Sequence, residues 1–128
     1  RSRGLGDVYK RQACLCAPAA FVDEHPEQCQ AIAHALVRAL KWLQTAGPSD
    51  LIRTVPEPYF EGDRSLYLAA FSRARESWAP DGLMPEQGPQ TVLRMLAQFG
   101  DAPQLQRVDL AQTFTNQFAQ AAKQRFRA

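Results

Sequence analysis

The chain has 128 residues, of which 45% are hydrophobic and 22% charged, a composition that suits one small globular domain or part of a larger one. Its 15 Lys and Arg residues against 13 Asp and Glu residues give a net charge of +2, with no basic block longer than the closing Lys123, Arg125 and Arg127, so nucleic-acid binding is not predicted. No apolar run approaches the roughly 18–20 residues that a membrane-spanning helix needs.

Residues 1–12, RSRGLGDVYKRQ, have neither a repeating apolar spacing nor a helix cap. Back-translation of residues 2–12 resembles a transposon-based sequencing-library adaptor read in frame. We therefore expect residues 1–12 to be a non-native, disordered segment and residues 13–128 to be the biological part of the chain. The segment carries four of the 15 basic and one of the 13 acidic residues, so without it the net charge falls from +2 to −1.

Residues 13–18, ACLCAP, form a short apolar run that ends at a proline, a pattern typical of a strand. The other segment that could pair with it is LQRV, residues 105–108. A buried strand with unpaired N–H and C=O groups costs a few kcal/mol or more. We therefore expect the strand at 13–17 to pair with a sheet that lies outside this chain.

Three cysteines, Cys14, Cys16 and Cys29, are present. A C-x-C pair with one distant cysteine and no close histidine is a poor zinc pattern, and alternate residues of a strand do not have disulfide geometry. The sequence therefore predicts small buried hydrophobic side chains without a metal or redox role.

Two helices are expected next, a short one at residues 19–24 and a long one from Pro26 to about Ala46, which Gly47-Pro48 ends. The long helix carries one continuous apolar stripe at helical spacing. Its members are Cys29, Ile32, Ala33, Leu36, Val37, Leu40 and Leu43. The free energy gained by burying this stripe is smaller than the conformational entropy cost of ordering some twenty residues. The helix therefore needs a broad apolar surface to lie on.

The rest of the chain reads as helices separated by proline-marked connections. Ser49 or Asp50 is expected to cap a short helix that ends before Pro56, and Asp63 to cap a helix that reaches Trp78. A turn-rich connection at 79–88 leads to a helix at 90–99 with Val92, Leu93 and Leu96 inward, and a last helix spans 109 to about 126. The expected fold is therefore mostly α, with about five helices and one short strand.

Residues suited to catalysis or to metal or cofactor binding are few. His25 precedes a helix start, His34 lies off the apolar stripe where we expect it to be solvated, and neither has a serine or cysteine partner at a recognisable spacing. The carboxylate pairs Glu57/Glu61 and Asp81/Glu86 lie in or beside loops, with no pocket indicated that would tune their pKa values. Phosphate-binding, dinucleotide-binding and zinc-protease motifs are absent. No catalytic, metal or cofactor residue is assigned, and an enzyme is not predicted.

Five aromatic residues are candidate stacking surfaces for a ligand. They are Trp42, Trp78, Tyr59, Phe60 and Tyr67. Trp78 and Tyr67 continue the inner face of their helix, and Trp42 flanks the stripe of the long helix. Core or interlobe packing is therefore favoured over ligand binding.

The order of segments resembles the C-terminal portion of periplasmic substrate-binding proteins of ABC importers, of the nitrate/sulfonate/taurine and thiamine-pyrimidine-precursor type. Three segments carry most of this resemblance. They are FVDEHPE at 21–27, PDGLMPEQGPQTVL at 80–93 and DLAQTFTNQF at 109–118. The resemblance extends over essentially all of residues 13–128 and depends on the order and spacing of the segments.

This resemblance implies a parent protein with a two-lobed α/β fold of periplasmic-binding-protein type II, of which this chain is the truncated C-terminal part. The parent is expected to bind a small-molecule solute outside the cytoplasmic membrane, without a cofactor, and to deliver it to an ABC permease. Its ligand lies between the lobes, largely on segments that would precede Ala13. The ligand-binding residues are therefore unknown, and this part of the parent is expected to be scaffold.

Two alternatives remain open. Thiamine-pyrimidine synthases share the same superfamily and carry a cysteine-rich strand near the place of ACLCAP, but only Cys14 and Cys16 correspond to it here. The amphipathic helices alone are also compatible with an autonomous helical interaction module, which would unfold cooperatively as a monomer.

Overall fold

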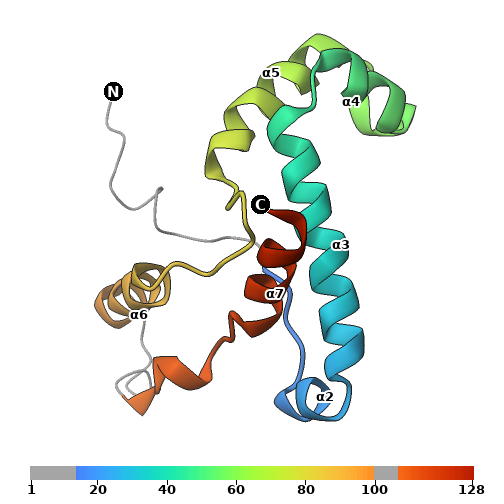
Figure 1. The fold of residues 1–128 in the computed structure, drawn as a ribbon. Coiled ribbons are helices and arrows are strands. Elements are labelled where there is room, and N and C mark those ends of the chain that lie inside the picture. The colour runs from blue at the N-terminus through green and yellow to red at the C-terminus, as the bar shows by residue number, and fades with distance from the viewer. Residues whose placement is uncertain (1–13, 100–106) are drawn as a thin grey trace.

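The computed structural model describes residues 14–99 and 107–128, and the regular elements in these ranges are all helical (Figure 1). The prediction of a mostly α fold is confirmed. The α-helices are α2 (Ala19–Glu24), α3 (Pro26–Thr45), α4 (Pro48–Thr54), α5 (Arg64–Ala74), α6 (Gln87–Phe99) and α7 (Gln117–Phe126). Short 3-10 helices lie at η1 (Glu57–Phe60), η2 (Arg75–Ser77) and η4 (Leu110–Gln112). The adaptor-like residues 1–12 lie outside the described residues.

The predicted strand is wrong for the residues that are described. Residues 14–18 have no regular secondary structure and are exposed. A strand requires a neighbouring strand for its backbone hydrogen bonds, and no sheet occurs among residues 14–99 and 107–128. Leu105 and Gln106, half of the proposed pairing segment, lie outside the described residues.

Helix α3 begins and ends where its sequence predicts. Pro26 occupies the first turn, where its missing N–H costs no hydrogen bond. The helix ends at Thr45, and Ala46 still donates its N–H to the Trp42 carbonyl. Gly47-Pro48 then prevents the helix from continuing. Helix α2 packs against the start of α3, with the Phe21 and His25 rings 4.9 Å apart.

Helix α4 is capped differently from the prediction. Gly47 precedes the first turn, and the Asp50 carboxylate accepts a hydrogen bond from the Gly47 N–H at 3.0 Å. Asp50 is thus the third residue of the helix and not its cap, because Pro48 fits the first position better than Ser49 does. The Gly47 N–H, together with Arg53, holds the pKa of the Asp50 carboxyl below its usual value.

Helix α5 is capped by Asp63, as predicted, since the Asp63 carboxylate accepts a hydrogen bond from the Leu66 N–H at 2.8 Å. The α-helix ends at Ala74, earlier than expected, and continues as η2. Arg75 links the end of α5 to the end of α3. Its guanidinium lies 4.8 Å from the centre of the Phe71 ring and donates hydrogen bonds to the carbonyls of Gln44 and Ala46.

Helix α6 begins at Gln87, three residues before the predicted start, because Pro89 is accepted within a first turn. Its apolar face is incompletely covered. Val92 and Leu93 are half-buried, but Leu96 is exposed. The prediction that Leu96 points inward is therefore wrong within the described residues.

The predicted last helix is in fact two separate elements, η4 and α7. Between them, Asn116 uses its side chain to bind the backbone of Met84, accepting from the N–H and donating to the C=O, both at 2.9 Å. Thr113 also bonds its hydroxyl to the Leu110 carbonyl. Side chains that bond to backbone groups in this way compete with helix formation, so the helix starts only at Gln117.

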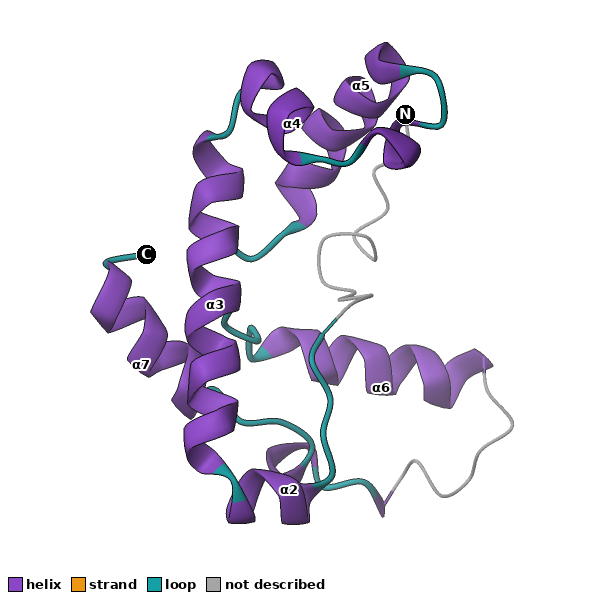
Figure 2. Cartoon of the chain, turned by 90° about the vertical axis from the view of Figure 1, so that its right-hand side faces the viewer, coloured by secondary structure: helices purple, strands orange, loops and turns teal. Residues whose placement is uncertain are grey.

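The structure is organised around α3. Figure 2 shows α7 on one side of α3, with α6 and the α4–α5 pair projecting on the other side. Helix α7 makes the most extensive contact with α3, and Gln30 bonds to the Phe118 carbonyl at 2.9 Å. The buried hydrophobic residues in the described ranges are Val37, Ala46, Leu51, Phe60, Phe71 and Ala122.

Only part of the apolar stripe of α3 is covered. Val37 is 1% exposed, whereas Ile32 and Leu36 are 45% and 42% exposed. These two residues therefore keep an apolar surface that nothing in residues 14–99 and 107–128 fully buries. No helix in the described part combines the length and the apolar character needed to cross a membrane.

The connection between η2 and α6 is fixed to both α3 and α7. Gly82 has a φ of +72°, and a Cβ at this position would lie 3.2 Å from Val37 Cγ2. Asp81 forms an ion pair with Lys123 of α7 at 2.8 Å. Partial burial alone would raise the pKa of Asp81, but hydrogen bonds from Lys123 and the Leu83 N–H outweigh it and lower that pKa.

We expect Asp81→Asn to lower the free energy of unfolding by about 0.5–1 kcal/mol at neutral pH, because the ion pair is partly exposed to solvent. A lowered native pKa stabilises the fold above the unfolded-state pKa, and this contribution is lost as the pH falls through the native pKa. The difference from the parent chain should therefore shrink below about pH 4. Urea unfolding at several pH values measures this difference in the free energy of unfolding. Glu86→Gln, at an exposed acid nearby, is the control, and a pH-independent difference for Asp81→Asn would contradict the assignment.

Candidate functional site

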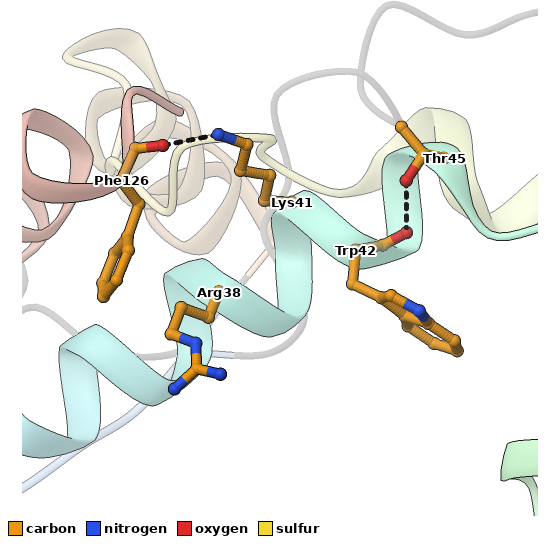
Figure 3. A pocket seen from close by; sticks show the side chains of 5 residues that line it. All are labelled: Arg38, Lys41, Trp42, Thr45 and Phe126. Carbon is orange, nitrogen blue, oxygen red and sulfur yellow. Dashed lines mark hydrogen bonds between the residues drawn. The ribbon is translucent and has the colours of Figure 1, made fainter.

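A shallow hollow of about 360 Å³ lies where the end of α7 meets the second half of α3 (Figure 3). It is lined by Arg38, Lys41, Trp42, Thr45 and Phe126. In Figure 3, Arg38 lies between the Phe126 and Trp42 rings. Four of these residues follow one another at helical spacing along α3, so the helix places them on neighbouring turns. We call these five residues, together with Arg125, the α3–α7 patch.

Lys41 holds the C-terminal end of α7 against α3. Its Nζ donates to the carbonyl of Phe126 at 2.5 Å and lies 3.4 Å from that of Arg127. The last carbonyls of a helix lack intrahelical partners and carry a partial negative charge. The Lys41 ammonium donates hydrogen bonds to these carbonyls and compensates their negative charge, so Lys41 has a structural role.

The Phe126 ring is surrounded by nitrogen-bearing side chains. The guanidinium carbons of Arg38 and Arg125 lie 6.0 and 5.6 Å from the ring centre. The His34 ring meets it edge-on, with the centres 5.5 Å apart. Cations near an aromatic face gain electrostatic stabilisation, so the Phe126 ring favours the presence of both guanidinium groups.

No carboxylate in the described ranges balances these cations by an ion pair. The ion pairs seen there join Arg53 to Asp50, Arg64 to Glu57, and Lys123 to Asp81. None of them includes Arg38, Lys41 or Arg125. The α3–α7 patch is therefore a local excess of positive charge beside two aromatic rings, one of which, Trp42, is 39% exposed. This combination is suited to binding an anionic group next to an apolar one.

The two histidines do not form a catalytic arrangement. His25 lies at the junction of α2 and α3, next to Phe21, which agrees with the predicted turn position. His34 is half-buried against Phe126, so the expectation that it is solvated is only partly correct. No group of three or more His, Cys, Asp or Glu side chains suited to a metal ion occurs in the described part of the chain.

The carboxylates of Glu57/Glu61 and Asp81/Glu86 have different surroundings in the structure. Glu57 forms an exposed ion pair with Arg64, and Glu61 ends η1 with a φ of 49°. Asp81 pairs with Lys123, and Glu86 is exposed. None of these four carboxylates lines the hollow between α3 and α7.

The aromatic residues mostly pack as predicted. Tyr67 meets Phe60, and Trp78 meets Phe71, with ring centres 4.9 and 5.3 Å apart. Tyr59 is exposed, and Trp42 lines the patch. The role of Phe126 was missed in the sequence, because it depends on a contact between residues 85 positions apart.

Cys14 and Cys16 are exposed, so the prediction that they are buried is wrong for these two residues, while Cys29 is half-buried. In the predicted strand, the side chains of Cys14 and Cys16 would be buried only if the strand lay within a sheet. Their sulfur atoms lie 3.6 Å apart, and the hydrogen bond with Cys16, followed by partial burial and charge interaction, raises the pKa of the Cys14 thiol. A raised pKa lowers the thiolate fraction of Cys14 at neutral pH.

Comparison with known proteins gives one informative result. No family model matches the chain, and no curated protein matches it significantly. A solved structure of a protein from Bordetella bronchiseptica RB50 superposes with a TM-score of 0.83 and 40% sequence identity, over 88% of this chain and 35% of that one. The chain therefore spans about a third of the length of this neighbour, and the two share the fold of this region.

Proposed function

We propose that this chain is the C-terminal part of an extracytoplasmic solute-binding protein that serves an ABC importer for a nitrate-, sulfonate-, taurine- or pyrimidine-like solute. The order of three segments, at residues 21–27, 80–93 and 109–118, is the observation that carries the proposal. Residues in or beside these segments contact one another through the hydrogen bonds Gln30–Phe118 and Met84–Asn116. The three segments thus belong to one packed unit.

The length of the Bordetella neighbour supports the view that this unit belongs to a larger protein. The same helical arrangement occupies 35% of that chain. Here, Ile32 and Leu36 of α3 and Leu96 of α6 keep exposed apolar side chains. Contiguous apolar surface marks a site of contact with further protein, and Ile32 and Leu36 stand one turn apart on α3. In the proposed parent, a second body of the same polypeptide covers it.

The mechanism that follows is capture without covalent chemistry. The parent would close two lobes around the solute, and the closed form would be recognised by the permease. The described part of the chain would supply scaffold and outward-facing surface. No acid–base pair or metal cluster is formed by the residues described, and the proposal uses none.

The test is to recover the natural reading frame upstream of Ala13 and to purify the whole protein. Calorimetry with nitrate, taurine, an alkanesulfonate and an aminopyrimidine should reveal binding of one of them, and the melting temperature should rise with ligand concentration. Residues 1–128 alone should bind none of the four.

Two results would contradict the proposal. The first is binding of one of these solutes by residues 1–128 as tightly as by the whole protein. The second is an upstream sequence with a cysteine cluster and iron-binding histidines, accompanied by turnover of a pyrimidine precursor, which would favour the synthase alternative.

A further inference from the structure

We propose that the α3–α7 patch is a docking surface for an acidic segment of a partner protein that carries an apolar anchor residue. The inference goes beyond the proposed function, because it concerns a surface and a partner chemistry that solute capture does not require. It rests on the charges, rings and shape of the patch.

Charge is the first argument. Arg38, Lys41 and Arg125 converge on the end of α7, and none of them forms an ion pair with a carboxylate in the described ranges. The carbonyls at the end of α7 engage Lys41, which leaves the two guanidinium groups without a negative partner there. Guanidinium groups bind carboxylates through two parallel hydrogen bonds, and such pairs favour partner recognition.

The aromatic side chains are the second argument. The exposed Trp42 ring and the half-buried Phe126 ring lie on either side of Arg38 (Figure 3). Tryptophan, phenylalanine and arginine are enriched in protein–protein interfaces, and tryptophan and arginine often dominate the binding energy. An apolar side chain between the two rings would place a neighbouring carboxylate beside Arg38.

The shape of the patch favours a protein segment over a small molecule. Arg38, Lys41, Trp42 and Thr45 are all exposed, so the hollow would leave much of a small ligand in water. Small-molecule sites normally bury most of the ligand surface. A peptide segment needs only a few anchored side chains, because the rest of its surface can extend over α3 and α7.

The test uses the whole 128-residue chain and a peptide of about twelve residues that alternates glutamate with small polar residues around two phenylalanines. Backbone NMR resonances should shift at Arg38, Trp42 and Phe126 on titration. A peptide with glutamine in place of every glutamate should bind at least about tenfold more weakly, and added salt should weaken the glutamate peptide.

Matched variants separate the patch from general charge effects. Arg38→Glu should weaken peptide binding by at least about tenfold, whereas Arg94→Glu on α6, with the same change of charge on an exposed helix face, should change it less than about twofold. Because Arg38→Glu also removes the contact of Arg38 with the Phe126 ring, the melting temperature of the variant is measured alongside binding. If it falls, Arg38→Gln with Arg125→Gln gives the same comparison without a new charge.

Four results would overturn the proposal. They are equal binding of the glutamine peptide, an equal effect of Arg94→Glu, resonance shifts confined to residues outside the patch, and binding to anionic lipid vesicles but not to the peptide. The last result would indicate a membrane surface as the partner. None of these results bears on whether the whole protein binds a solute, so failure here is distinguishable from failure of the proposed function.

Discussion

Replacing Phe60 by alanine is expected to lower the free energy of unfolding by about 3–5 kcal/mol. Phe60 is 2% exposed, its ring meets Tyr67 at 4.9 Å, and the Arg64 guanidinium lies 5.6 Å from its centre. Removing the ring leaves a cavity and also deprives Tyr67 and Arg64 of their contact. Urea unfolding followed by circular dichroism should show the loss.

The chain supplies a matched control in the adjacent residue. Tyr59 belongs to the same short helix, η1, but is 68% exposed. Tyr59→Ala removes an aromatic ring of similar size from the same backbone segment, and should change stability by no more than about 0.5 kcal/mol. Equal losses for the two variants would show that Phe60 is not a core residue.

Gly82→Ala is expected to destabilise the protein by about 2–3 kcal/mol, the second largest effect. Its φ of +72° disfavours any residue with a Cβ, at a cost of about 1–2 kcal/mol. In addition, the new Cβ would lie 3.2 Å from Val37 Cγ2 and 3.6 Å from Leu40 Cδ1, and such overpacking adds about 1 kcal/mol or more. Thermal and urea unfolding both measure the change.

Gly62 separates these two contributions. It has a similar φ of +80°, but a Cβ there would meet no atom within 4 Å. Gly62→Ala should therefore show only the backbone cost, about 1–2 kcal/mol. The prediction for Gly82 fails if the two substitutions destabilise equally, because the contact with Val37 would then contribute nothing.

The helices that the sequence predicts well are those determined by local signals. Pro26, Gly47-Pro48 and the apolar spacing between them define α3, and Asp63 defines the start of α5. Such features act within one or two turns, so a single sequence contains the information needed to place them.

The errors arise where distant residues decide the structure. The expected last helix is interrupted because Asn116 bonds to Met84, 32 positions away. The expected strand at 13–17 has no partner among the described residues, and its two cysteines are exposed as a consequence. Periodicity reports which face of a segment is apolar, but does not say which other segment lies opposite.

The α3–α7 patch also depends on contacts between distant residues, so the sequence pattern does not predict it. Arg38 and Lys41 are not members of the apolar stripe of α3, and Trp42 only flanks it. Phe126 is a member of an apolar stripe of α7. Only the packing of α7 on α3 brings Phe126 to these residues, and no spacing within the sequence indicates that juxtaposition.

The two groups of buried side chains share a single long helix. Val37 belongs to α3 and Ala122 to α7, which packs on α3, whereas Leu51 and Phe71 belong to α4 and α5, which contact each other beyond the end of α3, with Ala46 and Phe60 in the adjoining segments. Cooperative opening units in proteins follow such packed groups. The amide hydrogens of the two groups are therefore expected to exchange with solvent at different rates, although α3 connects the two groups.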